Sequence, residues 1–394
     1  MKTHKGYRIY PLTKAQTFHF YYLDKCPKKE VVNVGTSLTI EYELDFNVLK
    51  QSIYKAVERC DSMRLRFVYD SKEKKWYQYV VEKEDRDIEF FDFSHNTMEE
   101  TEAVMTTWTR VVFPLEDSPM YRIVMIKMPD GSQGIYLLIH HFISDAQSMI
   151  LFMKDIIELY CNTMYEGVEY PKEMRSYIEQ LEKDLEYEAG SRAQHVSLQC
   201  LLIMGIRTYL QKANGNDDVS INVAYARRAT LSEKKSGGTR IHSFPFRTII
   251  PEDKTFLEGI HMIRDGQNEI FRHVNYDPVE YFAYRAKTYP VAPGRTYEPM
   301  SLTYQPMTSK EQGLNKLGDI KYKTKWYPNG ATTQALYLTV MHRPDDNGLD
   351  FHFEHQIMAI SKNTLDHFYY YMCRIMFKGI EHPDMTIGDI IKLT

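Results

Sequence analysis

The sequence predicts a mixed α/β fold built from two domains. The chain has 394 residues, which is long for one ordinary domain and sufficient for two. Its 43% hydrophobic and 26% charged residues are typical of globular proteins and exclude a disordered, collagen-like or coiled-coil chain. Strand-like and helix-like segments interleave in both halves, which favours an α/β or α+β architecture.

The spacing of apolar residues predicts the elements of the N-terminal half. Residues 1–45 predict an N-terminal segment followed by a strand, because polar and apolar side chains alternate over residues 37–42. Apolar residues at helical spacing predict a helix over residues 48–57. Two strands joined by a polar turn are predicted at residues 64–70 and 75–81.

Residues 121–141 predict a β-hairpin followed by a helix. The β-rich runs YRIVMIKM and GIYLLIHH flank Pro129-Asp130-Gly131, a combination that favours a tight turn. Ser144 and Gln147 have the spacing of a capping box, and apolar residues over 149–160 predict the buried face of the helix that follows. Two histidines therefore end a strand just before a helix begins.

Residues 166–194 predict a crossover or linker because they are charged and poor in apolar positions, and we place the domain boundary near Ser191. The elements predicted beyond it are helices at residues 196–212 and 362–377 and strands at residues 219–228, 242–249, 302–305, 333–341 and 349–356.

Charge and cysteine usage limit the classes of partner and compartment. With Lys+Arg 49 and Asp+Glu 53 the net charge is -4, so nothing points to nucleic acid. The five cysteines are far apart, which argues against a disulfide framework or a zinc site. No apolar signal-peptide core or membrane-length run occurs, which predicts a cytoplasmic protein without a membrane span. The 30 tyrosines and 20 methionines fit either half-wet cavities or a codon bias.

The candidate site is the segment His140-His141-Phe142-Ile143-Ser144-Asp145. A strand end followed by a helix start is where α/β folds collect catalytic groups. A neutral imidazole there can accept a proton near pH 7, and adjacent histidines on a strand point to opposite faces. The alternative is structural: polar residues that end a strand, with Asp145 as an anion at a helix N-terminus.

The surrounding sequence favours the functional alternative. The segment 140–145 resembles the HHxxxD motif of the condensation-domain superfamily, acyltransferases that use coenzyme A or carrier proteins. Other segments resemble the family's motifs in the family's order. They are PLTKAQ (residues 11–16), RCDSMR (59–64, with Cys60 in place of histidine), FPL and PMYR (113–115 and 119–122), YARR (225–228), IHSFPFR (241–247) and LTYQ (302–305).

The resemblance implies a fold and a set of site residues. The fold would be two chloramphenicol-acetyltransferase-like lobes, residues 1–190 and 191–394, forming a V with a central substrate tunnel. His141 would be catalytic, and His140 and Asp145 would be structural members of the motif. Arg228 would be the arginine that pairs with Asp145, with Arg227 the next candidate. The residues expected at or beside the tunnel are Ser144, Ala146, His242 and Gln305.

The resemblance also implies an activity. We expect a stand-alone acyltransferase that joins an acyl or aminoacyl thioester to an amine, giving an amide. No bound cofactor and no metal are expected, because phosphopantetheine on a carrier protein acting in trans, or coenzyme A, would carry the substrate. The same fold could instead acylate an alcohol. A third alternative is an inactive docking module, which is favoured by Ala146 in place of glycine and His242 in place of asparagine.

Overall fold

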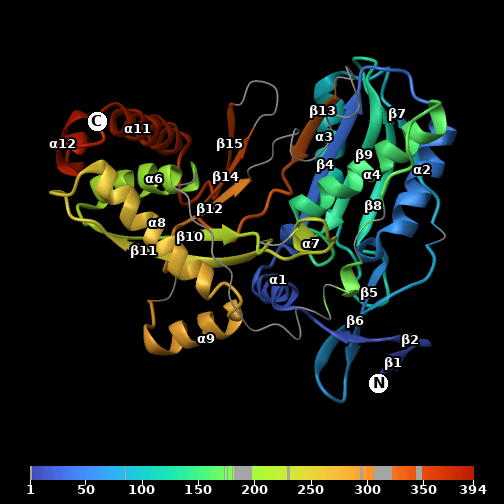
Figure 1. The fold of residues 1–394 in the computed structure, drawn as a ribbon, viewed down its shortest axis with the longest axis horizontal. Helices are drawn as coiled ribbons and strands as arrows, with labels where there is room; N and C mark the ends of the chain where they lie inside the picture. Colours follow the sequence, from blue (N-terminus) through green and yellow to red (C-terminus); the bar gives the residue numbers. More distant parts are fainter. Residues whose placement is uncertain are drawn as a thin grey trace. The chain divides into compact units, whose positions relative to one another are not determined.

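The computed structural model describes two compact units formed from discontinuous segments. The described residues are 2–84, 86–172, 174, 176–179, 181, 198–228, 231–292, 296–305, 322–342 and 348–394. Unit 1 consists of Met1–Tyr187, Arg228–Ile241 and Thr308–Thr333. Unit 2 consists of Glu188–Arg227, His242–Met307 and Gln334–Thr394. Each unit has its own five-stranded sheet (Figure 1).

Unit 1 combines its five-stranded sheet with a smaller three-stranded sheet and helices. Its elements are β1 (Thr3–His4), β2 (Tyr7–Arg8), β3 (Tyr10–Pro11), α1 (Lys14–Lys25), η1 (Lys29–Val32), β4 (Asn33–Ile40), α2 (Phe46–Arg59), η2 (Asp61–Arg64), β5 (Leu65–Asp70), β6 (Lys75–Val80), β7 (Glu89–Asp92), α3 (Met98–Trp108), β8 (Tyr121–Lys127), β9 (Gln133–His140), α4 (Ala146–Met164), α7 (Leu231–Lys234) and β13 (Tyr322–Tyr327).

Helices cover both faces of the five-stranded sheet of unit 1, whose strand order is β13-β4-β9-β8-β7. Alternate residues of β9 point to opposite faces. Tyr136 and Leu138 pack with Met105 of α3 in one apolar cluster. Ile135 on the other face lies beside Ile156 of α4. Because both faces are covered, all eight residues of β9 are buried, and the strand holds its carboxyl end in a fixed position.

Two segments from late in the chain complete unit 1. Strand β13 pairs antiparallel with β4, with Trp326 opposite Thr36. Residues 228–241 lie against the turn between β9 and α4, where Ser144 forms a β-bridge with Gly238. Gly238 has a φ of 85°, and a Cβ at this position would collide with the Tyr177 ring, so only glycine fits there.

Unit 2 packs its helices mainly against one face of its own sheet. The sheet order is β11-β10-β12-β14-β15, with β10, β12 and β14 parallel and antiparallel strands at both edges. Its elements are α6 (Leu198–Asn214), β10 (Asp218–Tyr225), β11 (His242–Ile249), α8 (Phe256–Arg272), α9 (Pro278–Thr288), β12 (Met300–Gln305), β14 (Leu336–His342), β15 (Leu349–His355), α11 (Lys362–Glu381) and α12 (Ile387–Leu393).

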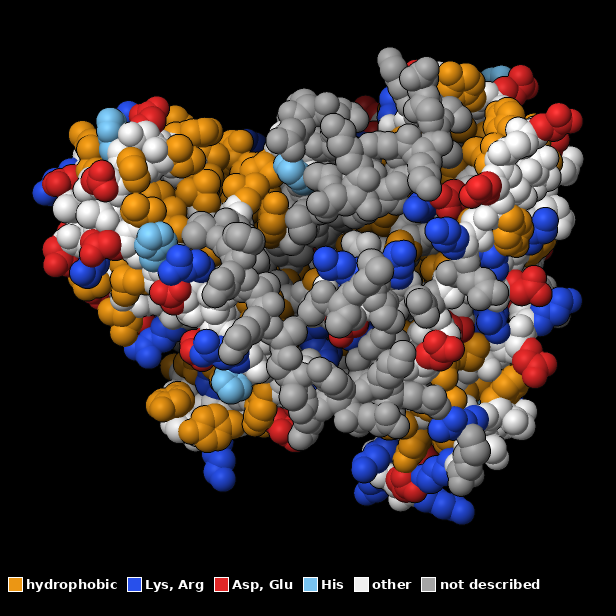
Figure 2. Space-filling view, viewed as in Figure 1, with side chains coloured by type: hydrophobic (Ala, Val, Ile, Leu, Met, Phe, Trp, Pro, Cys, Tyr) orange, Lys and Arg blue, Asp and Glu red, His pale blue; other side chains and the backbone are white. Residues whose placement is uncertain are grey.

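Side chains from α6, α8, α11 and α12 form the apolar core of unit 2 with alternate residues of the strands. The opposite face of the sheet is polar. Asn222, Ser301, Tyr337 and Glu354 follow one another across β10, β12, β14 and β15 in register. Apolar side chains also remain exposed over the α11 region (Figure 2), among them Phe377.

The predicted fold class is confirmed, and the predicted strands and helices that fall on described residues are present within a few residues. Helices α1, α3, α8, α9 and α12 and strand β13 were not predicted. The capping-box prediction at Ser144 was wrong, because Asp145 is the N-cap of α4 and accepts from the Ser148 amide. The Ser144 hydroxyl instead donates to the Asp145 carbonyl oxygen. The predicted boundary near Ser191 lies outside the described residues.

No helix in the described part of the chain is long and apolar enough to cross a membrane.

Candidate active site

The carboxyl end of β9 places the two motif histidines on opposite sides of the strand. Neighbouring segments fix the backbone here: the His140 amide donates to the Met120 carbonyl oxygen and the His141 amide to that of Val32, both at 2.8 Å. The His140 ring lies edge-on to Phe113. The His141 ring stacks on His19 of α1, with ring centroids 4.3 Å apart and an angle of 17° between the planes.

His140 is buried, with 2% of its surface exposed. Its Nδ1 accepts a 3.3 Å hydrogen bond from the Phe142 amide, which places the ring proton on Nε2. Burial lowers the pKa of His140 to about 3, and the neighbouring His141 adds to this shift. His140 is therefore neutral at physiological pH, and it packs in unit 1 rather than exchanging protons.

His141 is half-buried as a residue, and one of its ring nitrogens lacks a partner. Its Nδ1 is buried and has no hydrogen bond to any described residue. Burial lowers the pKa of His141, although the negative charge of Asp145 and the backbone nearby oppose the shift. The ring is thus neutral near pH 7 and can offer a lone pair, which is what a general base requires.

Asp145 forms the most highly connected polar cluster of the site. It is 4% exposed, and both of its carboxylate oxygens lie 2.8 Å from Nη2 of Arg228. The Arg240 amide donates to Oδ2, and the amide and hydroxyl of Ser148 donate to Oδ1. Burial alone would raise the pKa of Asp145, but the charge and hydrogen bonds of Arg228 outweigh it and lower the pKa. A carboxylate held in this way stays ionised and cannot orient the His141 ring as a catalytic-triad aspartate would.

The two arginines that follow β10 have different partners. Arg228 belongs to unit 1, where its Nη1 also donates to the carbonyl oxygens of Glu233 and Ser236. Arg227 belongs to unit 2, where its guanidinium donates to Oδ1 of Asn275. Its φ of 51° turns the chain between the two side chains. The geometry therefore selects Arg228 as the partner of Asp145.

The remaining predicted site residues divide between the units. Ser144 is buried beside Asp145, and Ala146 is the half-buried first residue of α4. His242 and Gln305 belong to unit 2. His242 is completely buried and bonded through both ring nitrogens, to the Val274 carbonyl oxygen and to Arg227. Oε1 of Gln305 is buried and has no partner among the described residues.

Sequence reasoning missed two residues that support the site. His19 provides the ring on which His141 stacks, and its Nε2 lies 3.3 Å from the Thr239 hydroxyl. Ser148 joins Asp145 to the Gly238 carbonyl oxygen. Ser148 could have been found three residues after the N-cap, where a side chain can reach back to the cap. No local signal distinguishes His19 from any other polar residue of an amphipathic helix.

A thiol nucleophile is disfavoured at this site. Cys60, which stands where the resembling motif has histidine, is buried, and its Sγ lies 3.3 Å from the Ser62 hydroxyl. Burial raises the pKa of Cys60 to about 11, so the thiolate is scarce at neutral pH. In the described ranges, no group of three or more His, Cys, Asp or Glu residues is arranged to hold a metal ion.

Comparison with known proteins identifies the family. The condensation-domain family model matches residues 7–193 and, in a second alignment, residues 179–393. The chain belongs to the condensation-domain family.

The curated relatives of this condensation domain are large peptide synthases. It is 19% identical over 435 residues to a plipastatin synthase component of Bacillus subtilis (strain 168), covering 97% of this chain and 17% of the relative. It is 21% identical over 443 residues to surfactin synthase subunit 2 of the same organism, covering 98% and 12%. This condensation domain therefore spans less than a fifth of the length of either relative.

Solved condensation domains share the fold. The first condensation domain of the CDA synthetase superposes with a TM-score of 0.76 at 18% identity, covering 97% of this chain and 98% of that one. A starter condensation domain of rhizomide synthetase, solved as a mutant in complex with C8-CoA, superposes with a TM-score of 0.81 at 16% identity, covering 96% of each chain. The motif histidines and Asp145 thus lie within a fold common to these domains.

Proposed function

We propose that this condensation domain transfers an acyl or aminoacyl group from a thioester to an amine, forming an amide, with His141 as the general base. The observation that carries the proposal is the state of His141. It is half-buried at the end of a rigid strand, its Nδ1 makes no hydrogen bond within the described residues, and its lowered pKa keeps it neutral near pH 7.

The proposed reaction needs one base and no covalent enzyme intermediate. The amine nitrogen attacks the thioester carbonyl carbon, and His141 accepts the proton that the nitrogen loses. The carbon–sulfur bond then breaks, and the proton passes from His141 to the leaving thiolate. A thiol with a pKa of about 8.5 is a good leaving group, so holding the two substrates together supplies much of the rate enhancement.

Asp145 and Arg228 would act as positioning residues. Their ion pair ties residues 228–241 to the turn between β9 and α4, and that turn carries His141. The bulk of the turn is buried, so the position of the base depends on an electrostatic cluster that does not itself exchange protons.

The substrate class follows from family membership and from the relatives. We propose that the donor is carried on phosphopantetheine of a carrier protein or on coenzyme A, supplied in trans, because a similar domain was solved with C8-CoA and the curated relatives are peptide synthases. The acceptor would be an amine, on a carrier or free.

The test is an acyl-transfer assay with both donor types and matched panels of amines and alcohols. Wild type should form amides, and His141→Ala should lower turnover by about 10²–10⁴-fold. His352→Ala is the matched control, because His352 is exposed on β15, and it should leave turnover unchanged. Undiminished turnover by His141→Ala would overturn the role of His141.

The products distinguish the alternatives. Esters in place of amides would assign the protein to alcohol acylation by the same base. Carrier-protein binding without turnover for any donor would assign it to docking, which the replacement of the motif glycine by Ala146 favours.

A further inference from the structure

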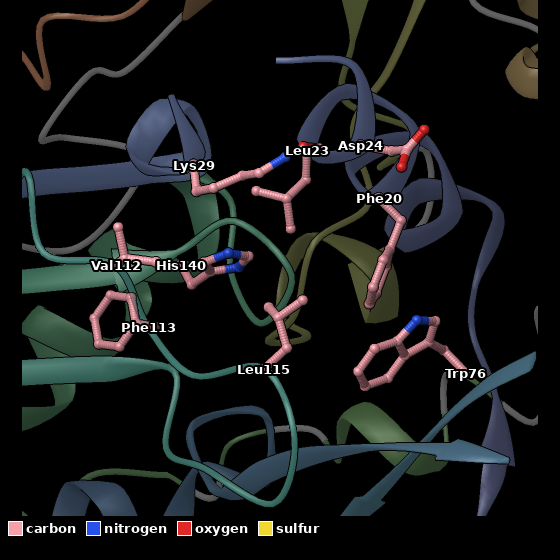
Figure 3. Close-up of a pocket in the computed structure, with 9 residues that line it drawn as sticks. All are labelled: Phe20, Leu23, Asp24, Lys29, Trp76, Val112, Phe113, Leu115 and His140. Atoms are coloured by element: carbon pink, nitrogen blue, oxygen red, sulfur yellow. Dashed lines mark hydrogen bonds between the residues drawn. The ribbon is translucent and has the colours of Figure 1, made fainter. Parts of the chain in front are cut away.

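A cavity of about 320 Å³ lies in unit 1 on the His140 side of β9. Its walls come from α1, β6, the loop before β8 and the end of β9 (Figure 3). The lining residues are Phe20, Leu23, Asp24, Lys29, Trp76, Val112, Phe113, Leu115 and His140. All of them belong to unit 1. The volume falls at the lower end of the range of small-molecule sites.

One buried polar group of the cavity has no protein partner. The imidazole of His140 extends into the cavity between Leu23 and Leu115 (Figure 3). Because Nδ1 accepts from the Phe142 amide, Nε2 carries the proton and is a donor. No described residue accepts from it, although His140 is only 2% exposed. A buried donor without a partner is costly, so the cavity favours a ligand with a hydrogen-bond acceptor.

The cavity also has a cation that no carboxylate neutralises. Nζ of Lys29 donates to the carbonyl oxygens of Leu23 and Cys26, and within the described residues it forms no ion pair. Asp24 is the one acidic residue of the lining. Its side chain is 76% exposed and pairs with Lys25, and its carboxylate is turned away from the cavity (Figure 3). The local charge therefore favours an anion.

The remaining walls are apolar and rich in aromatic rings. Phe20 lies beside Trp76, with ring centroids 5.3 Å apart, and Phe113 closes the side next to His140. Flat faces of this kind bind aromatic or branched apolar groups and add little hydrogen bonding. The chemistry of the cavity is thus one donor, one cation and an apolar enclosure.

We propose that this cavity binds a small carboxylate with an aromatic or branched apolar tail. The carboxylate would accept the hydrogen bond from Nε2 of His140 and balance the charge of Lys29, while the tail packs between Phe20, Trp76 and Phe113. The site lies on the opposite side of β9 from the His141 ring, so it is separate from the proposed acyl-transfer site and does not depend on that function.

The test is calorimetric titration of the full chain with 3-phenylpropanoate and with 3-phenylpropan-1-ol, which lacks the carboxylate. Wild type should bind the carboxylate saturably and the alcohol at least about 10-fold more weakly. Lys29→Gln keeps an amide donor for the helix carbonyls but removes the charge, and it should weaken binding about 10-fold. Lys28→Gln, the matched change at a lysine that does not line the cavity, should alter the affinity by less than about 2-fold.

Two further variants place the ligand in the cavity. Leu115→Trp fills the cavity and should abolish binding. Val112→Trp blocks its rim from an exposed position, so it should do the same without disturbing the core. Circular dichroism checks that each variant is folded. The proposal is overturned if wild type shows no saturable binding up to roughly 10 mM, if the alcohol binds as well as the carboxylate, or if folded Val112→Trp binds unchanged.

Discussion

The turn after β9 in unit 1 and the first residue of β11 in unit 2 both carry a histidine, but the two rings are bonded in opposite ways. His242 donates from Nδ1 to the Val274 carbonyl oxygen and accepts at Nε2 from Arg227, and it is completely buried. His141 leaves its Nδ1 without a partner among the described residues and remains half-buried.

The comparison separates a structural histidine from a reactive one. A ring whose two nitrogens are both bonded cannot accept a proton without breaking a bond. The His141 ring is held in place by stacking on His19 and keeps a nitrogen available. The sequence departure at His242 therefore has a structural use in unit 2, and it does not compete with His141 for the role of base.

The arginines that follow β10 give the strongest test of this difference. Arg228→Met leaves the buried Asp145 carboxylate without its ion-pair partner, and we expect it to destabilise the protein by about 3–5 kcal/mol. Arg227→Met, the same change one residue earlier, removes hydrogen bonds to Asn275 and His242 and should cost about 1–2 kcal/mol. Urea unfolding of both variants measures the two values, and equal losses would contradict the assignment of Arg228 to Asp145.

Acid should reveal the buried state of His140. Its folded pKa of about 3 lies below the unfolded value of about 6.5, so the unfolded chain binds a proton first as the pH falls. The contribution is fully present above pH 6.5 and is lost towards pH 3, at about 1.4 kcal/mol per pH unit. Between pH 6.5 and 4.5, wild type should lose about 2–3 kcal/mol more than His140→Gln. Parallel losses in both proteins would mean that His140 is not held neutral.

His242→Phe should have the smallest effect. It deletes two hydrogen bonds and leaves the Val274 carbonyl oxygen and Arg227 without this partner, which should cost about 1–2 kcal/mol. The pH dependence of acyl transfer should stay as in wild type, because the base is His141. A shift of the acidic limb of that profile in His242→Phe would remove the distinction between the two histidines.

Local patterns predicted much of the fold. The hairpin of β8 and β9, with its Pro-Asp-Gly turn, and strand β11 over His242–Ile249 match the spans expected from alternation and turn residues. Three missed helices begin with capping boxes that the sequence displays: Thr13 with Gln16, Thr97 with Glu100 and Thr255 with Glu258. These helices could have been predicted from their caps, whereas their apolar periodicity was too weak to reveal α1 and α3.

The sequence by itself determined the fold class, the opposite orientation of His140 and His141 on one strand, and the motif order that indicates the family. Only the tertiary structure decided that β13 pairs with β4, that Arg228 rather than Arg227 reaches Asp145, and that His19 stacks on His141. Periodicity and capping act over a few residues and leave a readable pattern. Contacts between segments far apart in the chain depend on packing and buried charge, which no short stretch of sequence encodes.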